Sequence, residues 1–410
     1  MMTKFEDIKV SNADYAFFLA VLLLCIIGLI AIYSASYQAE SPALKDNFAK
    51  QLVWLMLGLI LMGIIIILPV RFFWSLAYVL YFLTIFLLIL TLVINRGNPV
   101  ARWLPIGSFQ FQPSELAKIS VVIFLARYLA EEKRDLNKFK DILIAFVIVL
   151  VPALLIVNQP DLGTSLVFFA IVLPILFWAG LPSFYLFIIL TPFITMISSF
   201  NFYTYFLAMA LIIVVLLLFK RKILLSSLVI IANIVMGIIT PMLWNQMREY
   251  QRHRILTFLG LEMDPKGLSY QVIQSKVAIG SGGFWGKGIL KGTQTQLRFL
   301  PEQHTDFVFS VVGEELGFIG SSIVLILFLF LLLRAIYIAA KVRNKFSGLM
   351  VIGATAVLGF HIIINIGMTV GMMPVTGLPL PFLSYGGSFL LVSMSFVGII
   401  INASIRRFRY

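Results

Sequence analysis

The amino-acid sequence predicts an all-α integral membrane protein, a polytopic bundle of about 12 transmembrane helices with one large extracytoplasmic loop. Of the 410 residues, 61% are hydrophobic and only 12% are charged, which is about half the charged fraction of an ordinary soluble domain. The apolar residues stand in long unbroken runs, as in residues 16–32. Such runs cross the hydrocarbon core, which is about 30 Å thick, as helices that satisfy their own backbone polar groups. A polar, glycine-rich segment at 246–305 interrupts the series.

The first half of the bundle is predicted from apolar runs that short polar loops separate. The first run follows a polar segment and is long for a signal peptide, so it is interpreted as an uncleaved span. It contains Cys25, the single cysteine of the chain, and no intramolecular disulfide can therefore form. Pro113 stands near the first position of the fourth span, where a proline is well tolerated. The spans expected here are 14–35, 50–69, 72–95, 113–131, 142–157 and 164–180.

The second half of the bundle is predicted on both sides of the large loop. A proline-rich segment, 374–381, breaks the helical pattern near the outer face, and such breaks are tolerated where they line a cavity. The chain as a whole, 1–410, is expected to form a single membrane domain. The spans expected here are 183–200, 203–219, 225–244, 306–336, 347–372 and 385–405.

Basic residues predict the orientation, because short loops on the cytoplasmic side of a membrane carry an excess of lysine and arginine. If the N-terminus is cytoplasmic, the basic clusters at 133–140, 220–222, 341–345 and 406–409 all fall on the inner side. The short outer loops then keep few basic residues. Both termini are therefore expected in the cytoplasm, and the large loop is expected outside.

The large loop contains basic residues, an Asp-Pro pair and a run of glycines. Its basic residues are either a solvated surface or a site for an anionic lipid diphosphate, since arginine and lysine pair well with phosphate oxygens. The glycine run 280–288 is not a nucleotide-binding loop. That motif needs glycine where Ser281 stands and serine or threonine where Gly288 stands. Asp264 precedes Pro265, and the residues alone leave it either a turn-starting aspartate or a functional carboxylate.

A second polar cluster is expected at the outer end of the fourth span. Glu115 and Lys118 are three residues apart in a predicted helix, so they share a face and can form an ion pair. Arg102 precedes them in the same outer loop. The pair either closes the bundle or belongs to a site. His361 and Asn365, four residues apart in the eleventh span, are expected to form hydrogen bonds inside the bundle.

Three further acidic residues fall into two groups that have different interpretations. Asp161 is expected to cap the helix that begins near Thr164. Glu314 and Glu315 lie inside the apolar run after the large loop, and carboxylates within a membrane are costly and indicate function. The sequence shows neither a clustered His/Cys set with metal-ligand spacing nor a Ser-His-Asp motif.

Short motifs from the fourth span to the twelfth resemble the SEDS family, and they occur in the order that the family has. Two strings resemble its RodA branch rather than its FtsW branch: Gly292-Thr-Gln-Thr-Gln-Leu-Arg-Phe-Leu-Pro-Glu and Pro374-Val-Thr-Gly-Leu-Pro-Leu-Pro. The family motifs are Gln112-Pro-Ser-Glu-Leu, Gln159-Pro-Asp-Leu-Gly-Thr, Gln274-Ser, Ile279-Gly-Ser-Gly-Gly, Gly286-Lys-Gly, Leu300-Pro-Glu, His304-Thr-Asp-Phe, Glu314-Glu-Leu-Gly and Leu383-Ser-Tyr-Gly-Gly-Ser.

The resemblance implies a peptidoglycan glycosyltransferase that joins the disaccharide units of lipid II into glycan strands at the outer face of the bacterial cytoplasmic membrane. It would release undecaprenyl diphosphate and serve cell elongation and shape. The family's catalytic aspartate precedes a proline in the large outer loop and falls on Asp264. The family has about ten spans where this sequence has about twelve, and the surplus falls at 183–244, where an inserted helix pair is expected.

The resemblance also implies a set of ligands and partners. Lipid II, the growing glycan strand and a class B penicillin-binding protein are the expected partners, and nucleic acid is not one. No cofactor is required with certainty, although a divalent cation could help to neutralise the leaving diphosphate, and no metal-binding residue is predicted. The residues expected to bind substrate beside the base Asp264 are Lys50, Arg102, Glu115, Lys118, Gln274, Lys276, Lys287, His304, Glu314 and Ser384.

Two other functions stay open at this point. A transporter that flips lipid II across the membrane also needs many spans and buried charges. A non-catalytic scaffold for a penicillin-binding protein is the second alternative. Polar residues concentrated at the outer face favour chemistry there, because a flippase needs charged residues along a path through the bilayer.

Overall fold

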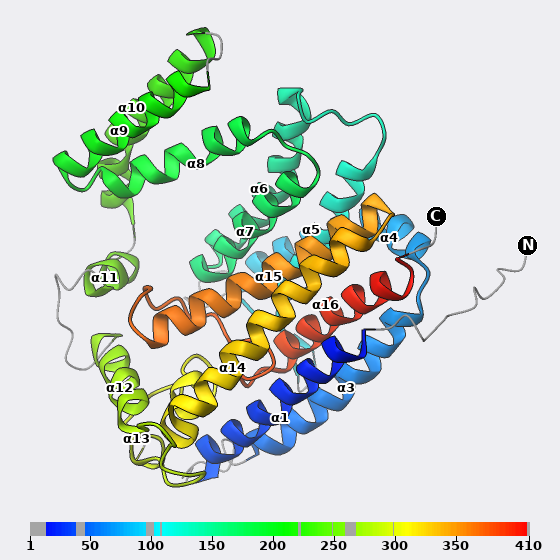
Figure 1. Ribbon diagram of the computed structural model, residues 1–410, viewed down its shortest axis with the longest axis vertical. Helices are drawn as coiled ribbons and strands as arrows, with labels where there is room; N and C mark the ends of the chain where they lie inside the picture. Colours follow the sequence, from blue (N-terminus) through cyan, green and yellow to red (C-terminus); the bar gives the residue numbers. More distant parts are fainter. Residues whose placement is uncertain are drawn as a thin grey trace, which may run out of the picture. The chain divides into compact units, whose positions relative to one another are not determined.

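The computed structural model describes residues 14–37, 46–95, 102–106, 109–219, 223–247, 249–258, 268–297 and 299–407, and helices make up most of this part of the chain (Figure 1). By its internal contacts the chain forms two compact units. Unit 1 consists of residues 1–179 and 264–410, and unit 2 of residues 180–263. Each unit is described separately below.

Every span that the sequence predicts contains a helix in the structure, so the expected all-α bundle is confirmed. Eight of these helices are long and apolar enough to cross a membrane. Of the others, α7, α8 and α9 are shorter, and α5 contains charged residues. The helices are α1 (Tyr15–Tyr37), α3 (Asn47–Ile67), α4 (Val70–Ile94), α5 (Pro113–Ala130), α6 (Phe139–Asn158), α7 (Leu162–Trp178), α8 (Ser183–Ser198), α9 (Phe202–Leu218), α10 (Ile223–Gln246), α14 (Val308–Lys341), α15 (Lys345–Thr369) and α16 (Gly387–Ile405).

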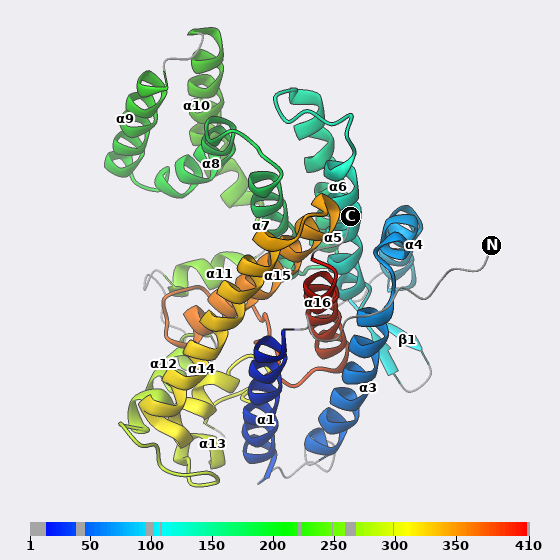
Figure 2. The same cartoon turned by 45° about the vertical axis from the view of Figure 1, so that its right-hand side comes forward.

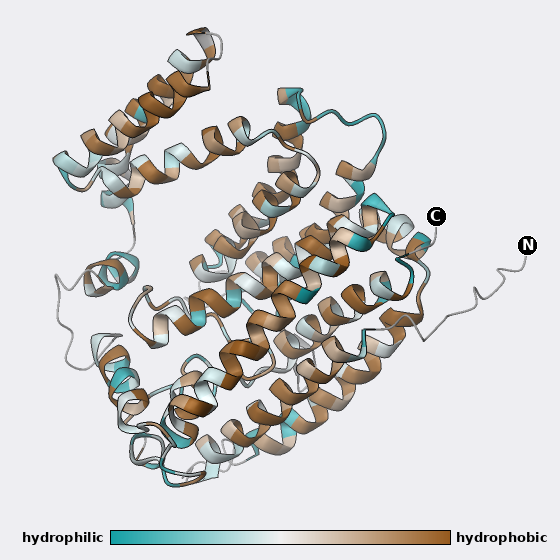
Figure 3. Ribbon diagram, viewed as in Figure 1, coloured by the Kyte–Doolittle hydropathy of each residue, from teal (hydrophilic) through white to brown (hydrophobic). Residues whose placement is uncertain are grey.

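Helix α15 is central to unit 1, since it packs against α5, α7, α14 and α16. Helix α16 is buried along nearly its whole length and packs mainly against α3, while α1 lies against α14 and α3 (Figures 1 and 2). The long helices are hydrophobic on all sides, and hydrophilic residues gather mainly near helix ends and in connecting segments (Figure 3). A helix that is apolar all round is typical of a membrane span.

A short β-hairpin precedes α5, and the sequence analysis did not predict it. Strands β1 (Leu104–Ile106) and β2 (Phe109–Phe111) pair antiparallel, with Leu104 opposite Phe111 (cyan in Figure 2). Three residues are too few for an alternating pattern to be recognised. One end of the unit 1 helices is here named the hairpin end. The segments that connect helices at this end are the β-hairpin, the turn 159–161 and the segment 370–386.

The segment 246–305, which was predicted as one large loop, contains three short helices among its described residues. It contains α11 (Glu249–Phe258), which belongs to unit 2, and α12 (Leu268–Ser281) and α13 (Thr293–Gln296), which belong to unit 1. Helix α12 packs against α14 and α15. The polar segment is therefore partly a set of short helices fixed to the bundle of unit 1.

Unit 2 has its own apolar core and a buried polar contact between two of its helices. Asn233 of α10 donates a hydrogen bond to Thr191 of α8 at 3.0 Å, and it accepts one from Thr195 at 3.0 Å. Such contacts hold helices together in lipid. The inserted pair expected within 183–244 falls in this unit, where α8–α10 stand, and its status as an addition stays a prediction. The core residues are Phe184, Ile212, Leu216 and Val229.

Candidate active site

The predicted ion pair lies at the start of α5 in unit 1. Because Pro113 begins the helix directly after β2, Glu115 falls in the first turn and Lys118 one turn later. Lys118 Nζ is 2.7 Å from Glu115 Oε1. The side chain of Lys118 is 0% exposed and that of Glu115 is 6% exposed. The expected pairing on one helix face is therefore present, and it is buried.

His361 of α15 extends this pair into a network. Its Nε2 lies 3.2 Å from Lys118 Nζ, and its Nδ1 lies 3.1 Å from the carbonyl oxygen of Pro379. A carbonyl oxygen only accepts, so Nδ1 donates and the neutral ring accepts from the lysine through Nε2. The ring of Phe389 of α16 completes the surroundings, 5.3 Å from Lys118 Nζ and 4.8 Å from the His361 ring. The network thus joins α5, α15, α16 and the proline-rich segment.

The contacts of Lys118 limit what its ammonium group can do. Its three N–H bonds face a carboxylate, an imidazole nitrogen and an aromatic face, so a phosphate could reach it only by displacing one of them. Glu115 differs, because its Oε2 is buried and has no hydrogen-bond partner among the described residues. Within this network, the acceptor not yet used belongs to Glu115.

Arg102 fixes the hairpin to the turn before α7. Its guanidinium donates to the carbonyl oxygen of Pro160, and its Nε lies 3.7 Å from Asp161 Oδ2. Asp161 in turn caps α7, as predicted, by accepting from the backbone nitrogen of Thr164 at 3.1 Å and from its hydroxyl at 2.9 Å. Arg102 keeps 34% of its side chain exposed, so it is the accessible cation beside this turn.

Ser384 lies within a tight web of bonds in the segment 370–386. Its hydroxyl donates to the carbonyl oxygen of Thr305 at 2.5 Å and accepts from the backbone nitrogen of Leu380 at 2.8 Å. Gln51 of α3 donates to the carbonyl oxygen of Ser384 at 3.2 Å and accepts from the backbone nitrogen of Gly386 at 3.2 Å. The buried Ser384 hydroxyl therefore holds the segment together, and contact with a substrate would require these bonds to change.

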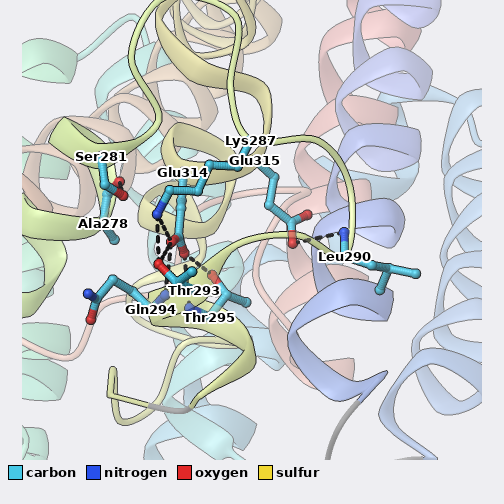
Figure 4. A network of polar contacts seen from close by, with 9 residues as sticks. All are labelled: Ala278, Ser281, Lys287, Leu290, Thr293, Gln294, Thr295, Glu314 and Glu315. Carbon is cyan, nitrogen blue, oxygen red and sulfur yellow. Dashed lines mark hydrogen bonds and ion pairs between the residues drawn. The ribbon is translucent and has the colours of Figure 1, made fainter.

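Glu314 organises the segment 282–297 (Figure 4). Its Oε1 accepts hydrogen bonds from Lys287 Nζ and from the backbone nitrogen of Gln294, both at 2.8 Å. Its Oε2 accepts from the backbone nitrogen and the hydroxyl of Thr295 at 2.9 and 2.7 Å. Lys287 also donates to Thr293 at 2.7 Å. Both oxygens of this fully buried side chain are occupied, which explains how the intramembrane carboxylate is tolerated.

The same segment lies against a kink in α14. At Gly317 the backbone leaves helical geometry, with φ 65° and ψ −159°, a conformation that glycine tolerates. A Cβ atom on Gly286 would lie 2.1 Å from the backbone oxygen of Glu315, and one on Gly317 would lie 2.2 Å from the backbone nitrogen of Gly286. The glycines at 286 and 317 therefore allow a close backbone approach between the segment and α14.

The remaining predicted site residues lie nearer the surface. Lys276 is exposed and Gln274 half-buried on α12. Between them the buried Ser275 bonds to Ser310 of α14 and to the carbonyl oxygen of Thr369, each at 2.6 Å. Lys50 is exposed on the first turn of α3. This polar contact fixes α12 against α14 and α15, and it thereby fixes the backbone positions of Gln274 and Lys276.

His304 packs beside Tyr385 in the connecting segments. The carbonyl oxygen of His304 accepts from the backbone nitrogen of Tyr385 at 2.9 Å, and the two rings are 5.8 Å apart. Burial raises the pKa of Tyr385 above its ordinary value, and its phenol O–H is a hydrogen-bond donor.

Asp264, the residue expected to act as the base, lies outside the described residues. Within the described ranges, no group of three or more His, Cys, Asp or Glu side chains could hold a metal ion. The unpartnered oxygen of Glu115 is a single ligand and does not make a cation site.

The sequence analysis missed several polar residues that hold this end of unit 1 together. Gln51 is one, and Ser34 is another, since its hydroxyl donates to Glu315 Oε1. Gln296 donates to Ser34, and Gln303 donates to the carbonyl oxygen of Ala35 at 2.9 Å, so both amides cap the end of α1. For Ser34 and Gln51, the available signal was a polar side chain within or beside an apolar run.

Comparison with known proteins agrees with this architecture. The chain matches the family described as Cell cycle protein, with FtsW, RodA and SpoVE as members, over residues 14–210 and 185–408. It is similar to peptidoglycan glycosyltransferase MrdB of Escherichia coli (strain K12), with 36% identity over 97% of this chain and 94% of that protein. It is similar to peptidoglycan glycosyltransferase RodA of Treponema pallidum (strain Nichols), with 34% identity over 97% of this chain and 99% of that protein.

A solved structure supports the same relationship. It comes from a study titled "Structural coordination of polymerization and crosslinking by a peptidoglycan synthase complex", and its matching chain is 31% identical to this one. The similarity covers 97% of this chain and 99% of that chain, with a TM-score of 0.73. With the ordered motifs, the membrane-spanning helices and full-length relatives in agreement, the chain belongs to the FtsW, RodA and SpoVE family of cell cycle proteins, the SEDS family.

Proposed function

We propose that this protein polymerises lipid II into the glycan strands of peptidoglycan, as a membrane-embedded glycosyltransferase that serves cell elongation and shape. The observation that carries this proposal is the buried Glu115–Lys118 pair, held by His361 at the hairpin end, in a chain whose full-length relatives are named peptidoglycan glycosyltransferases. A costly buried charge network at one end of a membrane bundle is typical of a functional site.

In the proposed reaction, the 4-hydroxyl oxygen of the acceptor attacks the anomeric carbon of the donor, whose bond to the diphosphate breaks. The hydroxyl proton passes to Asp264 as general base, and the configuration at the anomeric carbon inverts. Arg102, with its partly exposed guanidinium, is suited to compensate the charge of the departing diphosphate. Glu115, whose Oε1 is paired with Lys118, presents its unused Oε2 to a substrate hydroxyl.

The orientation and the partner belong to the same proposal. The hairpin end faces the outside of the cytoplasmic membrane, and both termini lie in the cytoplasm, because the basic clusters of unit 1 at 133–140 and 341–345 lie in the loops at the opposite ends of its helices. A class B penicillin-binding protein would cross-link the strands. A solved relative belongs to a study of a complex that coordinates polymerisation and crosslinking, which supports such a partner.

The experiment is polymerisation of purified lipid II by the purified protein with a cognate class B penicillin-binding protein, for wild type and Asp264→Ala. Long strands from the wild type alone are expected. Strands from both proteins would remove Asp264 from the role of base. Strands from neither, together with movement of lipid II across liposome membranes, would establish the flippase, and the absence of both activities would leave the scaffold.

A further inference from the structure

Two polar contacts join helices α1 and α14 of unit 1, one near each end of α1. Arg334 of α14 pairs at 2.5 Å with the buried Asp14, which directly precedes α1. At the hairpin end, Ser34 of α1 donates to Glu315 of α14. The contacts are 20 positions apart on α1, from 14 to 34, and 19 on α14, from 315 to 334. No charged residue stands between them on either helix. At 1.5 Å per residue each stretch is about 30 Å long, the thickness of the hydrocarbon core.

Exposed aromatic side chains stand at the same two levels. Tyr15 and Tyr337 flank the contact away from the hairpin end, and the ring of Tyr337 lies 5.0 Å from the guanidinium of Arg334. Tyr33 and Phe318 flank the contact at the hairpin end, and both are exposed. Aromatic rings gather at the two interfaces between a bilayer and water. Both helices therefore place the edge of the hydrocarbon core near Phe318.

The kink of α14 at Gly317 lies at this edge, and the segment 282–297 pairs with the backbone groups around it. Lipid offers no hydrogen bonds to an open backbone group, so this pairing lets the kink stand beside the hydrocarbon core. It also fixes the turn 283–286 to α14. The backbone bonds run from Phe318 to Gly283 at 2.9 Å, from Ile319 to Phe284 at 3.2 Å, from Lys287 to Glu314 at 3.0 Å and from Gly288 to Glu315 at 3.0 Å.

The fixed turn displays an aromatic cluster. The rings of Phe284 and Phe318 stack with centroids 5.5 Å apart, and Trp285 lies edge to face with Phe284 at 5.8 Å. Trp285 is 79% exposed although its backbone is held in place. An indole has an apolar body and one N–H, which suits the layer between hydrocarbon and water. The cluster continues a row of exposed side chains that share one face of α14, namely Phe318, Leu325, Leu329, Leu333 and Ile336.

We propose that Phe284, Trp285 and Phe318 form an anchor that inserts into the interfacial layer of the lipid leaflet at the hairpin end. The anchor holds the segment 282–297 at the membrane surface, with the rings against the upper acyl chains and the indole N–H toward lipid oxygens. A protein could also cover such a face. The depth of the cluster favours lipid, because lipid requires the level that α1 and α14 define and a protein partner does not. The anchor does not depend on the reaction, since none of its residues belongs to the predicted site.

The test measures the depth of a bimane fluorophore attached at Trp285→Cys, on the full-length protein in phosphatidylcholine nanodiscs. The native Cys25 is buried and should stay unlabelled. Leu325→Cys is the control for the hydrocarbon core, because Leu325 is exposed midway between the two polar contacts. Glu302→Cys is the control for water, at an exposed position before α14. A nitroxide on the lipid headgroup should cause the largest loss of fluorescence at 285, a nitroxide deep in the acyl chain at 325, and aqueous iodide at 302.

Two outcomes would overturn the anchor. Quenching of the label at 285 by iodide alone would place the turn in water, and protection from iodide by an added class B penicillin-binding protein would then assign the face to a protein. Quenching at 285 mainly by the deep nitroxide would place the turn inside the hydrocarbon core. Phe284→Cys, in the same turn, should report the same depth as Trp285→Cys and keeps the test decisive if the first variant fails to fold.

Discussion

Lys118 and Glu115 have different surroundings although they form one ion pair. The ammonium group is enclosed by Glu115, His361 and the face of Phe389, whereas one carboxylate oxygen has no partner in the described part of the chain. Lys118 therefore pairs with the carboxylate of Glu115, and the unpartnered Oε2 of that carboxylate is the atom available to a ligand. This assigns His361, which lies far along the chain, the role of positioning residue for the pair.

Replacing His361 by phenylalanine should slow lipid II polymerisation by about 10- to 100-fold, because Lys118 loses a buried acceptor worth about 1–3 kcal/mol. Steady-state rates should show the loss in kcat more than in KM, since the ring is fully buried. His361→Gln should restore part of the rate, as its amide can both donate and accept. Thr355→Val is the control on the same helix, because its hydroxyl bonds only within α15, to Val351. A rate for His361→Phe equal to that of the control would refute the positioning role.

Removing one partner of the ion pair should destabilise the protein more than removing both partners. Lys118→Met leaves a buried carboxylate without its cation, and such a loss costs about 3–5 kcal/mol. The double variant Glu115→Gln/Lys118→Met removes both charges and should regain most of the lost stability. It should not regain polymerisation. Thermal unfolding and strand synthesis, measured on the same preparations, check this, and recovery of activity in the double variant would show that the pair serves only the fold.

The segment 282–297 is held to α14 by two carboxylates, those of Glu314 and Glu315, and by a few backbone bonds. Lys287→Met should loosen it, because Glu314 then loses its cation while the glycine contacts remain. Hydrogen exchange of the peptides covering 283–297 should become faster, with the helices of unit 1 unchanged. Lys345→Met, at an exposed lysine on the first turn of α15, is the control. Unchanged exchange in Lys287→Met would mean that the remaining bonds of Glu314 and Glu315, together with the backbone contacts, are enough to fix the segment.

Sequence reasoning succeeded for elements and failed for contacts between them. The apolar runs predicted every long helix, because a chain in lipid has few alternatives to helix. The spacing of Glu115 and Lys118 predicted their pairing, since three residues in a helix are enough to bring them together. The approach of His361 to Lys118, 243 positions away, has no such local signal. The seven bonds that connect Glu314 and Glu315 with their surroundings likewise depend on how distant segments fold together.

At the scale of the whole molecule, unit 2 is expected to be dispensable for the site's internal geometry, because the Glu115, Glu314 and Ser384 networks consist of unit 1 residues. Asn233→Leu removes the buried polar contact between α8 and α10. It should lower the thermal stability of the protein while polymerisation at low temperature stays within about twofold of wild type. A large loss of activity in the folded variant would show that unit 2 takes part in the reaction.

The orientation of the molecule decides whether the proposed chemistry is feasible, because lipid II polymerisation requires the hairpin end to face outside. Glu302 is exposed in the segment before α14, and Lys133 is exposed between α5 and α6, at the opposite end. In intact cells, a membrane-impermeant maleimide should label Glu302→Cys at once and Lys133→Cys only after the membrane is permeabilised. The native Cys25 is buried and should give no background in either variant. Labelling of Lys133→Cys in intact cells, with Glu302→Cys protected, would place the hairpin end in the cytoplasm and remove the basis for outward glycan synthesis.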